Sequence, residues 1–169
     1  MLDMLLDIHP FHWHSILAAL FCGAIIGLER QLRGKPVGVR TSSLIALGTY
    51  TFVAVSLSIS TATSDPGRII GQVVTGVGFL GAGVMLSKDG EVIGVTSAAT
   101  IWVLAACGTC IAVGYAWTGI KIALIAVAIL YLVDHLEDVS SIFTRGVHAN
   151  YLWGSKTQAP LDEKDTDGR

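Results

Sequence analysis

A carboxylate and an arginine stand together where a long apolar stretch of the chain ends. Glu29 and Arg30 directly follow the apolar run 23–28, and Arg33 and Arg40 come soon after. A carboxylate at the rim of a bilayer is costly without a partner. Glu29 is therefore predicted to pair with Arg33, four residues on, or with Arg40, which would connect it to the next helix. The alternative is that Glu29 is a proton or cation ligand, or the switch residue of a regulatory contact.

A second set of polar residues opens another apolar stretch. Asp65 precedes Pro66, a pair typical of a helix N-cap followed by proline at the first helical position. Arg68 falls in the first helical turn, where the helix dipole disfavours a cation, so we expect it to pair with Asp65 or to bind an anion. Gln72, one turn deeper, would extend the polar face into the membrane, where an amide usually forms a hydrogen bond with another helix.

The three cysteines do not indicate redox chemistry. Cys107 and Cys110 have the C-x-x-C spacing of thiol reductases, but they lie in the middle of an apolar stretch. Thiols buried in hydrocarbon are poor nucleophiles. We therefore interpret these two residues and Cys22 as small packing residues.

A histidine cluster, His9, His12 and His14, precedes the first apolar stretch. Only Asp7 is close enough in the sequence to complete a ligand set, and histidine-rich tracts are common at membrane interfaces, so no metal site is predicted. The sequence shows no nucleophile with a base at recognisable spacing, no phosphate-binding glycine loop and no zinc-protease motif. We therefore predict no enzyme activity, no catalytic residue and no cofactor.

The composition is that of a membrane protein. Of the 169 residues, 52% are hydrophobic and 14% are charged, whereas roughly one quarter of a soluble domain is charged. Five apolar segments approach the ~20 residues that cross hydrocarbon, and they cover residues 14–31, 42–60, 69–87, 95–115 and 118–136. The predicted fold class is all-α, a polytopic bundle of about five transmembrane helices. A net charge of −2 without a basic stripe argues against a nucleic-acid partner.

The basic residues predict the orientation of the chain. The loop after the first helix holds Arg30, Arg33, Lys35 and Arg40, more positive charge than any other loop. Such loops face the cytoplasm. The N-terminus is then outside, and the C-terminus is cytoplasmic.

Small residues predict how the helices pack. Gly71, Thr75, Gly78 and Ala82 recur at helical spacing in the third segment, and the run 96–100 of the fourth is small and hydroxylated. The two segments are expected to approach closely and to form hydrogen bonds across their contact. We expect these two helices to be central, and the aliphatic fifth helix to face lipid.

Three regions are expected along the chain: a transmembrane domain over 1–138, a weakly amphipathic interfacial segment over 139–153, and a disordered acidic cytoplasmic tail over 154–169. The tail has too little apolar surface to offset the conformational entropy of folding.

Four strings resemble the MgtC/SapB family of bacterial inner-membrane proteins: G-A-I-I-G-L-E-R-Q at 23–31, G-V-R-T at 38–41, D-P-G-R-I-I-G-Q-V-V-T-G-V-G-F-L-G-A-G at 65–83, and G-V-T-S-A-A-T-I-W at 94–102. The resemblance implies functional polar residues at Glu29, Arg30, Arg40, Thr41, Asp65, Arg68 and Gln72. The residues assigned to helix packing are Gly23, Gly27, Gly71, Gly76, Gly78, Phe79, Gly81, Gly83, Thr96, Thr100 and Trp102.

The resemblance also implies a physiological setting. The best-known member of the family supports growth in low magnesium and survival inside macrophages, and it is thought to act on partner proteins, including the F-type ATP synthase, more than to transport magnesium. That member has a soluble domain after its last helix, where this chain has only the short acidic tail. The string at 94–97 also replaces the family's more usual G-L-T-T.

Three hypotheses follow. The leading one is a non-enzymatic protein of the bacterial inner membrane that modulates magnesium or proton homeostasis, and with it stress or virulence adaptation. It would act through contacts with other inner-membrane proteins and with lipid, alone or as a homo-oligomer. The alternative is a small oligomeric magnesium or proton transporter or channel that uses Asp65 and Glu29. In the third, the polar pairs only anchor the topology.

Overall fold

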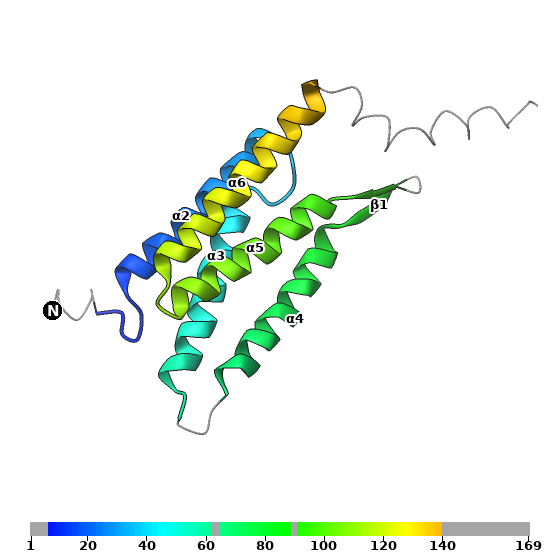
Figure 1. Ribbon diagram of the computed structural model, residues 1–169. Coiled ribbons are helices and arrows are strands. Elements are labelled where there is room, and N and C mark those ends of the chain that lie inside the picture. The colour runs from blue at the N-terminus through cyan, green and yellow to red at the C-terminus, as the bar shows by residue number, and fades with distance from the viewer. Residues whose placement is uncertain (1–6, 62–64, 89–90, 140–169) are drawn as a thin grey trace, which may run out of the picture. The chain divides into compact units, whose positions relative to one another are not determined.

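The computed structural model describes residues 7–61, 65–88 and 91–139, and within these ranges the chain forms five α-helices and one short β-hairpin. The helices are α2 (Trp13–Leu32), α3 (Val39–Ser58), α4 (Pro66–Val84), α5 (Val95–Ala112) and α6 (Ala116–Val139) (Figure 1). All five are long and apolar enough to cross a membrane. The predicted all-α membrane bundle is confirmed.

The segment between α4 and α5 differs from the prediction. There β1 (Leu86–Lys88) and β2 (Glu91–Ile93) pair as an antiparallel hairpin. α4 ends at Val84, three residues before the predicted end at 87, because Met85 takes an extended backbone conformation. Hydropathy stays high past this point, but it does not report the backbone conformation.

Local chemistry defines several helix ends. Gly34 after α2 and Gly114 after α5 have φ angles of 64° and 93°, in the left-handed region that glycine tolerates. The N–H groups of each glycine and of the residue after it donate to carbonyls of the last helical turn, which is the Schellman pattern. At the start of α4, the Asp65 Oδ1 accepts a hydrogen bond of 2.9 Å from the Gly67 N–H. The predicted N-cap is confirmed.

α2 and α3 pack backbone against backbone. A Cβ atom added to Gly23 would lie 2.4 Å from the Cα of Ser43, and one added to Gly27 would lie 2.5 Å from the Cα of Val39. Gly23 and Gly27 are four residues apart in α2, and their partners Ser43 and Val39 are four residues apart in α3. The antiparallel helices therefore meet along one continuous line, at a distance that only glycine allows.

α5 is the central helix of the bundle. It contacts α2, α3 and α4, and its Gly108 fits so closely that an added Cβ would lie 2.6 Å from the Ala46 carbonyl oxygen of α3. Cys107 of α5 and Cys22 of α2 have no exposed surface. The packing role predicted for these two cysteines is confirmed.

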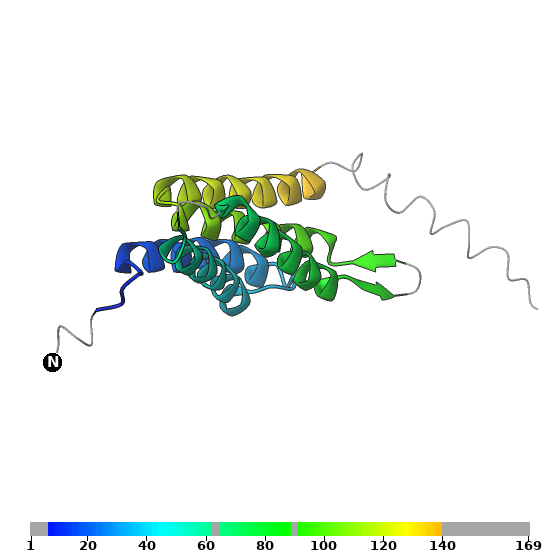
Figure 2. The same cartoon turned by 90° about the horizontal axis from the view of Figure 1, so that it is seen from below.

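α4 lies at the edge of the bundle, contrary to the prediction that it is central (Figures 1 and 2). Of its membrane-spanning window 11% is buried, against 50% for α5. Gly81 contacts Ala98 of α5, with 3.7 Å between an added Cβ and the alanine Cβ. An added Cβ would meet open space at Gly71, Gly76, Gly78 and Gly83. A glycine pattern shows that a helix can be approached closely, but it does not specify the neighbour.

α6 is largely exposed, as expected of a helix that faces lipid. At its start, a Cβ added to Gly119 would lie 3.0 Å from the Cys107 carbonyl oxygen of α5. The chain divides into two compact units, 1–131 and 132–169, and the described residues of the second unit form the end of α6. The predicted interfacial segment after residue 139 and the predicted tail lie outside the described residues.

Gly27→Ala is expected to destabilise the protein by about 1–3 kcal/mol, because the new methyl group overlaps the backbone of α3, which cannot yield without separating the two helices. Gly71→Ala is the matched control, since the same methyl group meets open space. There alanine is expected to be neutral or slightly stabilising, because it favours the helix. Thermal unfolding of the purified protein in detergent compares the two variants, and equal melting temperatures would contradict the close packing.

Candidate functional site

Glu29 and Arg30 form a buried ion pair at the end of α2. The Arg30 Nε donates to the Glu29 Oε2 at 2.5 Å, and the Arg30 Nη2 donates to the Oε1 at 2.9 Å. The two side chains are 8% and 2% exposed. Two parallel hydrogen bonds between a guanidinium and a carboxylate are the strongest form of this interaction, and they satisfy both carboxylate oxygens.

The predicted partners of Glu29 are partly correct. The Arg33 Nε lies 3.7 Å from the Glu29 Oε1, which confirms a salt bridge four residues on. The closer partner, however, is the adjacent Arg30. This pairing agrees with the ion pair that the sequence indicates at the end of the apolar run, although adjacent helical residues normally point in different directions. Arg40 is exposed and, among the described residues, forms no salt bridge with Glu29, so the expected link to the next helix through Arg40 is absent.

Arg33 also contacts α6. Its guanidinium carbon lies 5.5 Å from the centre of the Tyr131 ring, a cation–π distance. This contact was not predicted from the sequence. A signal for it exists, since Tyr131 falls near the predicted cytoplasmic end of its helix, where tyrosine is enriched at the interface.

The connection between α2 and α3 holds further polar contacts that were not predicted from the sequence. The Gln31 Oε1 accepts a 3.3 Å hydrogen bond from the Val39 N–H, and thereby caps α3. The Ser42 hydroxyl donates to the Val37 carbonyl at 3.0 Å. Val37 has a φ angle of 68°, which is strained for a β-branched residue, and its side chain is buried. A strained backbone persists only where the surroundings fix it.

The second predicted polar set is separate from the first. Asp65 and Arg68 lie beyond the far end of α3 from Glu29, and α3 is about 30 Å long from its rise of 1.5 Å per residue. Arg68 is exposed and forms no salt bridge with Asp65 in the described part of the chain. Gln72 is also exposed, and the expected hydrogen bond to another helix is not found among the described residues.

The hydroxylated start of α5 does not bond across the helix contact. The Thr100 hydroxyl donates to the Ser97 carbonyl of its own helix at 2.7 Å. A threonine hydroxyl is readily satisfied in this way, which removes the need for a partner on α4. Thr96 is exposed, Phe79 is 82% exposed, and Trp102 is 49% exposed, so about half of the Trp102 surface is covered by the described chain.

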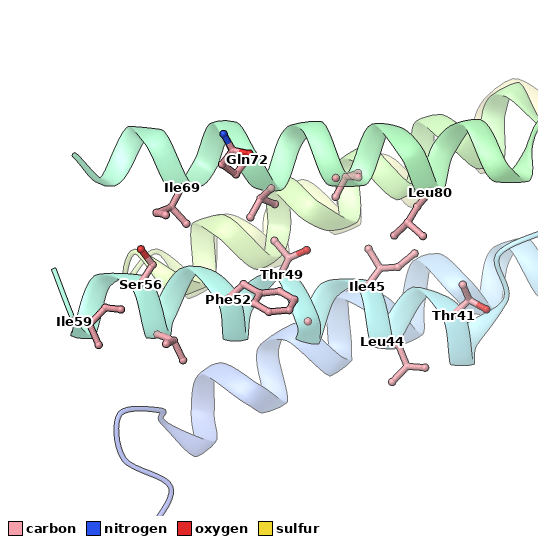
Figure 3. A pocket seen from close by; sticks show the side chains of 15 residues that line it. Thr41, Leu44, Ile45, Thr49, Phe52, Ser56, Ile59, Ile69, Gln72 and Leu80 are labelled. Atoms are coloured by element: carbon pink, nitrogen blue, oxygen red, sulfur yellow. The ribbon is translucent and has the colours of Figure 1, made fainter. Parts of the chain in front are cut away.

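An apolar groove of about 770 Å³ runs between α3 and α4. Ile69 and Leu80 point from α4 toward α3, and Ile45 and Thr49 point from α3 toward α4 (Figure 3). Thr41 and Gln72, two of the predicted polar residues, also line this groove.

The described residues give no cluster for a metal ion. No three histidine, cysteine or acidic side chains among them are placed to hold a metal ion. In the histidine cluster, the rings of His12 and His14 stack with centroids 5.3 Å apart.

The fold and this site define a multi-pass helical membrane protein with a neutralised acid at one end of its first described helix. The sequence profile described as the MgtC family matches residues 16–139. The chain belongs to the MgtC family.

Curated relatives agree with this assignment. The chain is 45% identical over 128 residues to "Putative magnesium transporter YhiD" of Escherichia coli (strain K12), a match that covers 72% of this chain and 59% of the relative. It is 43% identical over 100 residues to "Protein MgtC" of Salmonella typhimurium (strain LT2), covering 59% and 42%. An uncharacterized protein of Haemophilus influenzae is 38% identical over 121 residues, covering 66% and 51%. The chain thus spans about half the length of these relatives. No solved structure matches the chain.

Arg30→Met is expected to destabilise the protein by about 3–5 kcal/mol, because it leaves the buried Glu29 carboxylate without its closest partner. Adding Glu29→Gln to this variant is expected to recover much of the loss, since the uncompensated charge disappears. Arg33→Met is expected to cost about 1 kcal/mol or less, because its contact is longer and partly exposed to solvent. Denaturant titration in detergent measures all three variants, and a larger loss for Arg33→Met than for Arg30→Met would show that the partners are assigned in the wrong order.

Proposed function

We propose that this chain is a non-enzymatic protein of the bacterial inner membrane that modulates magnesium or proton homeostasis through contacts with other membrane proteins. The observation that carries the proposal is the state of the two acidic residues. Glu29 is held by two arginines, whereas Asp65 is exposed and uses one carboxylate oxygen to cap α4. A cation path would need open carboxylates, because Mg²⁺ takes several oxygen ligands and gives up water reluctantly.

The topology and location of the chain are part of this proposal. The loop that holds Arg33 and Lys35 joins α2 to α3 and lies at the same end of the helices as the Glu29–Arg30 pair. By the positive-inside rule this end faces the cytoplasm, with the N-terminus outside and the C-terminus inside. Family membership supports the inner membrane as the location. Adaptation to stress or to a host belongs to the proposal as its physiological setting.

The edge position of α4 supplies a contact surface. Gly71, Thr75 and Ala82 are exposed, and Gly78 is half-buried. An added Cβ at Gly71 or Gly78 meets open space. In a membrane, small residues on an exposed helix face let a second backbone approach closely, which is the main source of helix association there. We assign this small-residue face of α4 to contact with a partner membrane protein or a second copy of the chain.

The second candidate function is a small oligomeric transporter or channel for magnesium or protons. It is favoured by the name of one relative, "Putative magnesium transporter YhiD". In this chain the path would have to connect Asp65 with Glu29 through an oligomer, because no described helix carries an acidic side chain between them.

The two functions differ in ion flux. Purified protein in liposomes that hold magnesium and pH indicators is expected to give no flux above empty liposomes, because the buried Glu29 carboxylate is already neutralised by two arginines. Glu29→Gln and Asp65→Asn serve as matched variants. Flux in the wild-type protein that both amide variants abolish would establish the transporter and overturn the regulatory proposal.

Ala82→Leu is expected to abolish the contribution of the protein to growth in low magnesium, because the larger side chain blocks the small-residue face of α4. Ala128→Leu is the matched control, since it places the same side chain on the exposed face of α6. Both variants are expected to reach the membrane at wild-type levels. The measurement is the growth in low magnesium of a deletion strain complemented by each variant. Equal growth of the two complemented strains would show that the small-residue face of α4 is not the contact surface.

A further inference from the structure

The apolar groove between α3 and α4 has a cationic side chain at each end. Arg40 directly precedes the lining residue Thr41 and lies four residues before the lining residue Leu44. Arg68 lies four residues before the lining residue Gln72. Residues four apart share a helix face. Each arginine therefore stands about 40° around its helix from a lining residue, one near each end of the groove, although neither belongs to the lining itself.

Both arginines are free to bind an anion. Each is exposed, and neither forms a salt bridge with a described residue. Each also falls in the first turn of its helix, Arg40 in α3 and Arg68 in α4. A cation is disfavoured there by the helix dipole, and a neighbouring anion offsets that cost. Arginine is well suited to phosphate because its planar guanidinium donates two parallel hydrogen bonds.

The length of the groove along α3 is close to the thickness of the hydrocarbon layer. Its lining runs from Thr41 to Ile59, just after the end of α3, about 27 Å at the helical rise, and the hydrocarbon core of a bilayer is ~30 Å thick. Along α4 the lining runs from Ile69 to Leu80, about 17 Å at the same rise. Large apolar side chains line the groove and stay open to its contents, with Phe52 at 72% and Ile59 at 74% exposed. The interior thus suits acyl chains, and its two ends lie where lipid phosphates would be.

The groove and the small-residue face lie on opposite sides of α4. Gly76 lines the groove, whereas Gly78, two residues on, is turned by about 200° and faces the opposite side of α4. Helix partners in membranes favour small residues, and those gather on the Gly78 side. The groove side of α4 presents Ile69, Val73 and Leu80 instead, which leaves lipid as the better occupant.

We propose that the α3–α4 groove is a binding site for anionic phospholipid, with acyl chains along the groove and phosphates held by Arg68 in one leaflet and Arg40 in the other. This site is independent of the regulatory function proposed above. It predicts that the protein selects anionic over zwitterionic lipid at this groove alone.

Photocrosslinking in nanodiscs tests the proposal with the full chain. Phosphatidylglycerol with a diazirine in one acyl chain is expected to label peptides of α3 and α4 that line the groove. Unlabelled phosphatidylglycerol is expected to compete several-fold better than phosphatidylcholine. In Arg40→Gln/Arg68→Gln this preference is expected to disappear, whereas Lys121→Gln, which removes an exposed cation of α6, is expected to retain it.

A matched glycine pair tests the position of the acyl chains. Gly76→Leu is expected to reduce groove labelling several-fold, and Gly78→Leu to leave it unchanged, although both sites have open space for the side chain. Equal competition by the two lipids in the wild-type protein would overturn the proposal without any variant. Labelling that survives Gly76→Leu, or protein–protein crosslinks between two copies through the groove, would overturn it as well.

Discussion

The close approach of α2 and α3 is the contact on which the rest of the bundle depends. With no side chain at Gly23 and Gly27, the two backbones meet directly. That distance brings the end of α2 beside the start of α3, so Gln31 can reach the first free N–H of the next helix. It also confines the connecting loop, where Val37 is held at a positive φ angle with its side chain buried.

The ion pair at the end of α2 follows from the same geometry. Burying a carboxylate costs several kcal/mol unless hydrogen bonds and an opposite charge replace water. Arg30 meets this demand with two hydrogen bonds, and Arg33 adds a longer contact on the side where Tyr131 lies. The charge is therefore neutralised within α2 itself, and Arg40 remains available at the membrane surface.

Much of this architecture could be predicted from the sequence, because a helix in hydrocarbon needs a long apolar run and its ends need defined caps. The five spans and the Asp65 cap were predicted on these grounds. The β-hairpin was missed, since its two three-residue strands contain Ser87, Lys88 and Glu91 and resemble a polar loop in the sequence. The position of α4 was also missed. Glycine at helical spacing looks the same when it contacts α3, as Gly27 does, and when it faces outward, as Gly78 does.

The glycine contact between α2 and α3 has a consequence for how the chain enters the membrane. Two helices that touch along their backbones and are joined by a loop of six residues can leave the insertion machinery as one hairpin. Part of the buried face of the pair stays open at that moment, because α5 packs against both helices. The hairpin is the template onto which α5 assembles. The order of packing therefore differs from the order of synthesis in this protein, because α4 is made before α5 but packs mainly against it.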